Sequence, residues 1–307
     1  MSASVTPETI PIRAAGEPPG VLAPDPARVF LVRAERFEQL ATGHSLGAWL
    51  GFLAALTRVQ HRAIASYPTL TLPDADALAL ACAHRMPVVP AQSWQRAPVW
   101  RDVLAALCAD LLPLAPTAAV PKLQLLQALP AADLEALAEQ VLHTDYTGPD
   151  NALLPYVAAA LQVHWTAAAS RLAASLQVLD APGVCPCCGF LPVGSVVKSA
   201  GDVANLRYLH CALCNTEWNL VRVKCAACDA TESIGYRLLE DADAQRREAV
   251  RAETCDSCHS YLKIIYQEKG GVDPVADDLA TLALDILLDE AGYGRAGPNL
   301  LLVPEVA

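Results

Sequence analysis

In the first half of the chain, apolar and polar residues alternate with the period of an α-helix. Residues 26–179 are rich in Ala and Leu, and prolines divide them into separate segments. Apolar positions that recur every three to four residues share one side of a helix, which is typical of helices that pack together. The pattern predicts helices at 26–42, 46–66, 74–85, 98–112, 118–128, 130–143 and 150–178. We therefore expect a helical domain over 26–179, preceded by a Pro-rich flexible segment over 1–25.

After residue 180 the pattern changes to short runs of β-branched and aromatic residues. Cysteines and turn residues bound these runs, as they do in the strands of small metal-stabilised modules. The runs predict strands at 193–197, 206–210, 218–223, 234–239 and 261–266. With the helical first half, they indicate an α+β fold: an N-terminal all-α domain, then two small rubredoxin-like or zinc-ribbon β modules and a C-terminal helix.

The C-terminal helix is predicted at 274–292. Pro274 suits a first helical turn, and Gly292 suits the position just after a helix end. The apolar face of this helix would consist of Val275, Leu279, Leu282 and Ile286. The opposite face, which we expect to be solvated, would consist of Asp278, Thr281, Asp285 and Asp289.

Most of the eleven cysteines lie in the second half, where eight of them form four Cys-x-x-Cys pairs. In such a pair, a tight turn directs both sulfurs at one ion about 2.3 Å away. Four pairs supply two tetrahedral sites, which makes the signal much stronger than one pair alone. The residue after each pair supports this interpretation, because all four are types that tolerate a positive φ. They are Gly189, Asn215, Asp229 and His259.

Sequential pairing is the simplest way to divide the eight cysteines between two ions. It gives a first metal module at 181–220, with Cys185, Cys188, Cys211 and Cys214 as ligands. The second module, at 221–270, has Cys225, Cys228, Cys255 and Cys258 as ligands. Cross-braced pairing, first with third and second with fourth, is also chemically possible. Four thiolates suit zinc and rubredoxin-type iron alike, and a closed site of this kind is expected to be structural.

Two other functions of the cysteine pairs are disfavoured. The segment Cys255-Asp-Ser-Cys258-His259 matches a c-type haem attachment site, but that use requires export and would strand Cys225 and Cys228. Thioredoxin-like redox chemistry needs a βαβ pattern around the pair, and none surrounds these pairs.

Three further residues beside the pairs are expected not to be ligands. Cys187 lies between two ligand cysteines, and we expect a thiol that faces solvent. His210 directly precedes Cys211, and His259 directly follows Cys258, but both sites already have four thiolates. We therefore expect both histidines to support the turns rather than bind an ion.

Composition and charge narrow the functional classes further. Eleven cysteines, an odd number, in 307 residues argue against a secreted disulfide framework. The first twenty residues lack the basic and apolar stretches of a signal peptide, and the polar residues of 151–170 favour a core helix over a membrane span. The net charge is −11, and 181–270 contains ten Lys and Arg against eleven Asp and Glu, which disfavours nucleic acid as a partner. We expect a cytoplasmic protein.

Longer motifs surround the cysteine pairs. They are Cys185-Pro-Cys-Cys188-Gly189-Phe-Leu-Pro192-Val193, Leu206-Arg207-Tyr208-Leu209-His210-Cys211-Ala-Leu-Cys214, Thr216-Glu217-Trp218, Val221-Arg222-Val223-Lys224-Cys225, Cys258-His259-Ser260-Tyr261-Leu262-Lys263 and Ala276-Asp277-Asp278-Leu279-Ala280. With Arg33-Ala34-Glu35-Arg36 and residues 47–56, they closely resemble the FdhE family, accessory proteins for formate dehydrogenase formation.

The resemblance implies a cytoplasmic maturation factor that is not an enzyme. Such proteins are thought to bind the catalytic subunit of respiratory formate dehydrogenases before its export. They are also thought to carry iron in two rubredoxin-like sites, for which zinc is the alternative. The eight paired cysteines match that pattern one to one, while His259 stands where glycine is expected.

Two other functions compete with a maturation factor. One is a rubredoxin-like electron carrier, and the less favoured one is a zinc-ribbon nucleic-acid-binding protein. A large helical domain without a cofactor motif favours a binding function, and the sequence has no recognisable nucleophile–base pair or phosphate-binding loop. Thr216, Glu217 and Trp218 form the first patch to consider for a partner, with Trp218 either an exposed anchor or part of the ribbon core.

Overall fold

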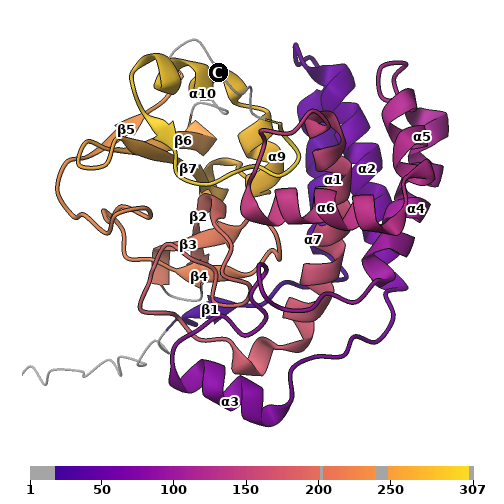
Figure 1. The fold of residues 1–307 in the computed structure, drawn as a ribbon. Helices are drawn as coiled ribbons and strands as arrows, with labels where there is room; N and C mark the ends of the chain where they lie inside the picture. The colour runs from indigo at the N-terminus through magenta and orange to yellow at the C-terminus, as the bar shows by residue number, and fades with distance from the viewer. Residues whose placement is uncertain (1–17, 201–202, 240–247, 304–307) are drawn as a thin grey trace, which may run out of the picture.

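The chain folds into a group of helices packed against one mixed β-sheet (Figure 1). The computed structural model describes residues 18–200, 203–239 and 248–303. The first half forms α1 (Val29–Ala41), α2 (Gly47–Ala65), α3 (Ala75–Ala83), α4 (Val99–Leu111), α5 (Val120–Ala128), α6 (Ala131–His143) and α7 (Leu154–Arg171). Each predicted helix is present, and the predicted bounds are close to the observed ones except at 150–178, where α7 is shorter.

Helix α7 is the central element of the helical part. Nearly all of its side chains are buried, from Leu154 to Ala169, because α4 and α6 pack on it and the first cysteine segment adjoins it. Its many alanines let these neighbours approach closely. The expectation of a core helix over 151–170 is confirmed.

Helix α3 is the opposite case. Its sequence, ADALALACA, is apolar, yet none of its residues is buried. Asp74 caps its N-terminus by accepting a hydrogen bond from the N–H of Ala77 at 2.8 Å. Figure 1 shows α3 apart from the other helices, at the lower end of the molecule. Leu80 exposes 62% of its surface and Met86, just after the helix, exposes 58%.

The strands of both cysteine segments join in a single sheet. Its strands are β1 (Val21–Leu22), β2 (Pro192–Ala200), β3 (Val203–Cys211), β4 (Glu217–Asn219), β5 (Ile234–Arg237), β6 (Val250–Cys255), β7 (Ser260–Tyr266) and β8 (Gly294–Arg295). The order is β1-β4-β3-β2-β7-β6-β5, with β8 beside β7. Strand β2 pairs in parallel with β7, so that Val196 lies opposite Ile265. The two metal-bearing segments therefore share a sheet, whereas the sequence suggested separate modules.

Three strands of this sheet, β1, β6 and the two-residue β8, were not predicted from the sequence. Strand β6 is Val-Arg-Ala-Glu-Thr-Cys, which contains few β-branched residues, so its pattern was weak. Strand β1 lies in the segment that was expected to be flexible. It pairs with β4, and Val21 lies opposite Trp218 in this pairing. That expectation is therefore wrong for the part around β1, and residues 1–17 lie outside the described residues.

The predicted C-terminal helix is two helices, α9 (Pro274–Leu279) and α10 (Leu282–Glu290). The break at Ala280 and Thr281 rotates the second helix, so Leu284 and Leu288 are buried and Ile286 is 61% exposed. The predicted apolar face is therefore wrong beyond the break. The acidic face is not solvated throughout either, since Asp278 is completely buried.

A buried cation explains why Asp278 is inside the protein. The ammonium of Lys263 lies 3.2 Å from the Asp278 carboxylate and also donates to the carbonyls of Asp278 and Thr281. Arg295 forms a second ion pair with Asp278. Opposite charges within hydrogen-bond distance make burial of these groups tolerable. The α+β fold class is confirmed, with this ionic cluster fixing the C-terminal helices on the sheet.

Candidate metal centres

The structure brings the eight paired cysteines together in two groups of four. In the first group, the Sγ atoms of Cys185 and Cys214 are 3.4 Å apart, and those of Cys188 and Cys211 are 3.5 Å apart. All four sulfurs lie within 4.8 Å of one another. Four sulfurs at about 2.3 Å from a tetrahedral ion would be about 3.8 Å apart. The first group therefore fits a metal ion.

The second group has the same arrangement. The Sγ atoms of Cys225 and Cys258 are 3.7 Å apart, as are those of Cys228 and Cys255. These spacings also fit a tetrahedral four-thiolate site. The sulfurs are grouped sequentially, as predicted, and not in the cross-braced arrangement.

The backbone at the cysteine turns explains how the sulfurs converge. The residue after each pair has a positive φ: +71° at Gly189, +60° at Asn215, +66° at Asp229 and +52° at His259. This left-handed residue reverses the chain, and its N–H can donate to the carbonyl of the first cysteine, as Gly189 does to Cys185 at 2.8 Å. The prediction made from these four residue types is confirmed.

The electrostatics of the first group favour a bound cation. Burial raises the pKa of Cys185 and of Cys188 well above the usual range of a thiol. Burial also opposes the charge of Cys214, but hydrogen bonds from the neighbouring thiols outweigh it and hold the pKa of Cys214 well below that range. Four buried thiolates would repel one another without an ion, so a divalent cation is what would allow all four to ionise.

Asn215 links the second turn of the first group to three other elements. Its side-chain oxygen accepts from Arg33 of α1 at 2.6 Å and lies 3.1 Å from Nε2 of His210 in β3. Its amide nitrogen donates to the hydroxyl of Thr166 in α7 at 2.8 Å. Arg33 in turn pairs with Asp273 at 3.0 Å. The turn that positions Cys214 is therefore held by the helical part of the chain.

His210 and His259 lie outside the ligand sets, as expected. His210 is buried between Asn215 and Glu217, and its Nδ1 lies 3.3 Å from the Glu217 carboxylate. Burial opposes the charge of Glu217, yet His210 and Lys198 outweigh burial and lower its pKa to about 2. His259 is exposed at the last turn, with its ring 6.2 Å from that of Tyr293.

Cys187 corrects an expectation. Its side chain is completely buried rather than solvent-facing. The N–H of Val89 donates to the Cys187 carbonyl at 2.9 Å, and the next backbone bond runs from Ala91 to the Cys188 carbonyl at 2.8 Å. These two bonds cover the first turn with the segment around Val89. Cys187 is thus covered because the segment around Val89 lies across its turn.

The patch of Thr216, Glu217 and Trp218, considered from the sequence as a partner-binding surface, is largely buried. Thr216 is buried, and Trp218 exposes 1% of its surface. The indole N–H of Trp218 donates to the carbonyl of Pro182 at 2.7 Å, which ties β4 to the segment before the first cysteine pair. The alternative in which Trp218 packs the ribbon is the one observed.

The sequence analysis quoted Arg33, Arg36 and Asp277 within longer motifs but assigned no function to them, and it did not name Asp273. Arg36 donates to Asp277 at 2.8 Å, parallel to the bond between Arg33 and Asp273, so two ion pairs join α1 to α9. Residues three or four apart lie on the same face of a helix, so the spacing of the two arginines and of the two aspartates could have suggested one basic face and one acidic face. Their meeting across more than two hundred residues was not visible in the sequence.

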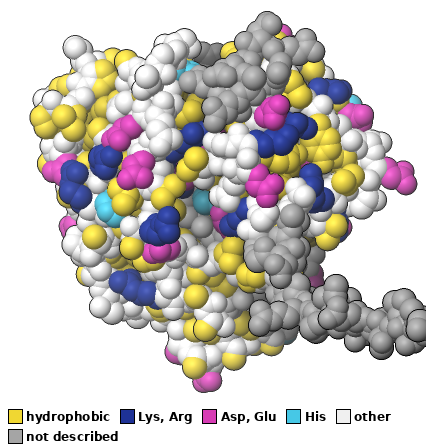
Figure 2. All heavy atoms as spheres, turned by 180° about the vertical axis from the view of Figure 1, so that it is seen from behind, with side chains coloured by type: hydrophobic (Ala, Val, Ile, Leu, Met, Phe, Trp, Pro, Cys, Tyr) yellow, Lys and Arg dark blue, Asp and Glu magenta, His cyan; other side chains and the backbone are white. Residues whose placement is uncertain are grey.

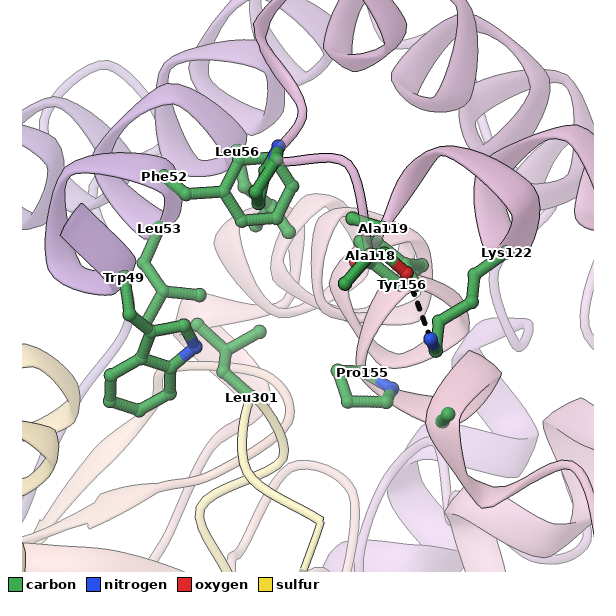
Figure 3. Close-up of a pocket in the computed structure, with 12 residues that line it drawn as sticks. Trp49, Phe52, Leu53, Leu56, Ala118, Ala119, Lys122, Pro155, Tyr156 and Leu301 are labelled. Atoms are coloured by element: carbon green, nitrogen blue, oxygen red, sulfur yellow. Dashed lines mark hydrogen bonds between the residues drawn. The ribbon is translucent and has the colours of Figure 1, made fainter.

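An apolar pocket lies in the helical part, between α2 and α7 (Figure 3). Its volume is about 240 Å³, and Trp49 and Phe52 of α2 face Pro155 and Tyr156 of α7 across it. The ammonium of Lys122 lies at its side and donates to the carbonyl of Ala118 at 2.9 Å. This lining resembles a site for an apolar side chain more than a catalytic centre.

The surface is mixed in charge on the face opposite to that of Figure 1. Figure 2 shows Lys and Arg side chains interspersed with Asp and Glu, rather than gathered in one basic field. This distribution agrees with the sequence argument against nucleic acid. Among the described residues, no helix has the length and hydropathy that crossing a membrane requires.

Models of one protein family match this chain from the first helices to the C-terminal segment. Family models match the chain over residues 18–180 (FdhE, N-terminal), 184–222 (FdhE, central domain) and 223–302 (FdhE, C-terminal domain). The chain belongs to the FdhE family. These are the formate dehydrogenase formation proteins, so the resemblance drawn from the motifs is confirmed.

Individual FdhE proteins are similar over almost their whole length. The FdhE homologue of Edwardsiella ictaluri is 44% identical, covering 92% of this chain and 91% of its own. That of Serratia proteamaculans is 39% identical, covering 89% and 87%. The crystal structure of FdhE from Pseudomonas aeruginosa superposes with a TM-score of 0.80 at 34% identity, covering 93% and 99%.

Proposed function

We propose that this FdhE protein is a cytoplasmic maturation factor that binds the catalytic subunit of a formate dehydrogenase and has no turnover of its own. The observation that carries this proposal is the FdhE match over nearly the whole chain, together with two tetracysteine groups at the centre of its motifs. Four thiolates around one ion leave no position for a substrate. A protein built in this way acts through binding.

The eight cysteines would hold two ions, and iron is the metal we propose, with zinc as the alternative. The sulfur spacings of 3.4 to 3.7 Å suit either metal. When bound, such an ion fixes the geometry of its turns and supplies folding free energy. The protein's own residues then present a shaped surface, and the metal takes no part in formate chemistry.

Helix α3 is the surface that we propose for contact with the catalytic subunit. Most of its residues are apolar and none is fully buried, and Pro87 after it packs on Gly189 of the first cysteine turn. Exposed apolar surface of this kind is typical of protein-binding sites. The contact of Pro87 with Gly189 joins the segment after this helix to the first cysteine group, which would couple metal loading to partner binding.

The test is co-purification of the catalytic subunit with the full chain, together with formate-dependent activity in a deletion strain. Leu80→Asp should abolish the complex, whereas Leu114→Asp, 60% exposed elsewhere on the helical part, should leave it intact. A normally assembled enzyme without this protein, and no detectable complex, would overturn the proposal. That outcome would favour the rubredoxin-like electron carrier instead.

A further inference from the structure

The two tetracysteine groups differ sharply in burial. In the first group every cysteine exposes 1% of its surface or less. In the second, Cys225 and Cys255 are buried, but Cys228 and Cys258 are exposed. Each exposed sulfur lies 3.7 Å from a buried one, so one side of the second group faces solvent.

The surroundings of the first group close it on several sides. Its cysteines belong to the main apolar core, together with residues of α7. The side-chain amide of Gln162 in α7 donates to the carbonyl of Ala212, between the two cysteines of the second turn, at 2.8 Å. The segment around Val89 covers the first turn through its bond to Cys187. An incoming ligand would have to displace packed helices to reach an ion there.

The surroundings of the second group leave its turn tips open. Ala227 and Asp229, on either side of Cys228, are exposed, and so are Ser257 and His259 on either side of Cys258. The apolar cluster that supports the sheet beside this group is small, with Ala252, Tyr261, Leu284 and Leu288 as its buried members. In Figure 1 the loops before β5 form the edge of the molecule away from the helices.

Exposure decides how fast a thiolate-bound ion can be exchanged. An incoming ligand must reach the ion while a protein sulfur leaves, so access limits the rate just as it limits thiol reactivity. A cysteine at the surface can leave the ion and return without disturbing the core. One buried in a close-packed interior cannot, because the packing around it would have to open.

We infer that the second tetracysteine group is an exchange site, which gains and loses its ion through Cys228 and Cys258, while the first group keeps its ion. This inference rests on the proposed two-metal state. The ion is a divalent, thiolate-binding one, and its external carrier is a thiol ligand. In the exchange, two carrier thiols bond to the ion and give up their protons to the leaving sulfurs of Cys228 and Cys258. Two further carrier thiols then replace Cys225 and Cys255 in the same way, so that the ion leaves bound to four carrier thiolates, and loading is the reverse. The oxidation state of the ion does not change.

Ser260 controls this exchange without being a ligand. Its Oγ lies 3.0 Å from the Cys258 sulfur, at hydrogen-bond distance from a ligand that has to leave. A hydroxyl that donates to a thiolate stabilises it in place. We therefore expect Ser260→Ala to accelerate release from the second group alone. Thr216, whose Oγ1 lies 3.1 Å from the Cys214 sulfur, is the matching position in the buried group.

The experiment uses the full chain loaded with two equivalents of Zn²⁺, mixed with a coloured zinc chelator in stopped flow. One equivalent should be released at least tenfold faster than the other. Iodoacetamide added during the fast phase should label Cys228 and Cys258 before any cysteine of the first group, as read by peptide mass spectrometry. Ser260→Ala should accelerate the fast phase severalfold, and Thr216→Ala should leave it unchanged.

Three results would overturn the inference: release of both ions at one rate, first labelling at Cys185 or Cys211, or loading of fewer than two ions per chain. A Cys258→Ser variant adds a check that does not depend on Ser260, because it should lose the fast equivalent and keep the slow one. Failure to bind the catalytic subunit would refute the proposed function but leave these kinetics unaffected, so the two ideas fail separately.

Discussion

At the scale of single residues, positions after the cysteine pairs serve both the backbone and the packing. Asn215 has a φ of +60° and also bonds to Arg33, His210 and Thr166. His259 has a φ of +52° but is exposed, with only the ring of Tyr293 near it. Both residues adopt the positive φ that the turn requires. Only Asn215 also stabilises the fold through buried hydrogen bonds, so replacing it should cost more free energy of unfolding than replacing His259.

Replacing Asn215 should separate the two contributions. Asn215→Gly keeps the left-handed backbone but leaves Arg33 with one partner fewer, and should destabilise the zinc-loaded protein by roughly 2–3 kcal/mol. Asn215→Ala should cost about 1 kcal/mol more, because alanine also disfavours the positive φ. His259→Gly, the control without the network, should be neutral or stabilise by up to about 1 kcal/mol. Denaturant unfolding measures all three, and equal losses for the Gly and Ala variants of Asn215 would contradict this account.

His164 should make stability depend on pH. It is buried in α7, with Nδ1 2.6 Å from the hydroxyl of Tyr67, and burial lowers its pKa to about 4. In the unfolded chain a histidine has a pKa of about 6.5, so the unfolded state binds a proton first as the pH falls. Stability should therefore decrease from about pH 6.5 to pH 4, by about 3 kcal/mol at most, and level off below.

The comparison for this prediction is His164→Gln, which does not titrate. Denaturant unfolding at several pH values should show a shallower acid dependence in that variant. Loss of metal at low pH affects both proteins, so the difference between their slopes isolates the histidine. Parallel slopes would show that His164 stays neutral in both states or is protonated in both.

At the scale of secondary-structure elements, the break between α9 and α10 follows from the charges beneath it. Lys263 of β7 bonds to the carbonyls of Asp278 and Thr281 at the end of α9, and to the carboxylates of Asp278 and Asp285. These bonds satisfy carbonyls that end the helix, so the chain can turn there. A continuous helix would keep those carbonyls for itself and would leave Lys263 buried with fewer acceptors.

Lys263→Met should therefore be strongly destabilising. It removes one of the two cations that pair with the fully buried Asp278 and the donor to the carbonyls of Asp278 and Thr281, and removing one partner of a buried ion pair costs about 3–5 kcal/mol. Arg58→Met is the matched control, since Arg58 pairs with Glu38 at the surface and both side chains are at least 40% exposed. That change should cost less than about 1 kcal/mol. Similar losses for the two variants would mean that the buried cluster contributes no more than a surface pair.

At the scale of the whole molecule, the helical part and the first cysteine group share one core. The main apolar cluster runs from α1, α2 and α7 to Cys185, Cys188, Cys211 and Cys214 and on to α9. The sequence predicted a helical domain over 26–179 that is separate from the two cysteine modules. The shared core shows that the first group is not separate from the helices. The four cysteines of the second group do not belong to that core, which reaches this group only at Ala226.

Loss of one ligand from each group should show this difference. Cys214→Ser and Cys258→Ser should each bind one ion instead of two. Amide hydrogen exchange should accelerate in α7 for Cys214→Ser, because the core against that helix is disturbed. For Cys258→Ser it should accelerate only in β5, β6 and the turns of the second group. Faster exchange of α7 in both variants, or in neither, would contradict the shared core.

Local sequence was sufficient to predict the seven N-terminal helices and the grouping of the paired cysteines. Helical periodicity depends on local spacing, and so do the turns at Gly189, Asn215, Asp229 and His259, where residue type alone permits the backbone. A Cys-x-x-Cys pair is also local, which is why the two groups of four cysteines could be predicted from their order along the chain.

Strand pairing, side-chain burial and ion pairs between distant residues could be established only from the folded structure. The parallel pairing of β2 with β7, the burial of Cys187 and Trp218, and the meeting of Lys263 with Asp278 each require a partner that no local pattern specifies. The difference in exposure between the two cysteine groups has the same origin. Both groups have the same spacing and the same ligands, but only the first was enclosed when α7 and the segment around Val89 packed over it.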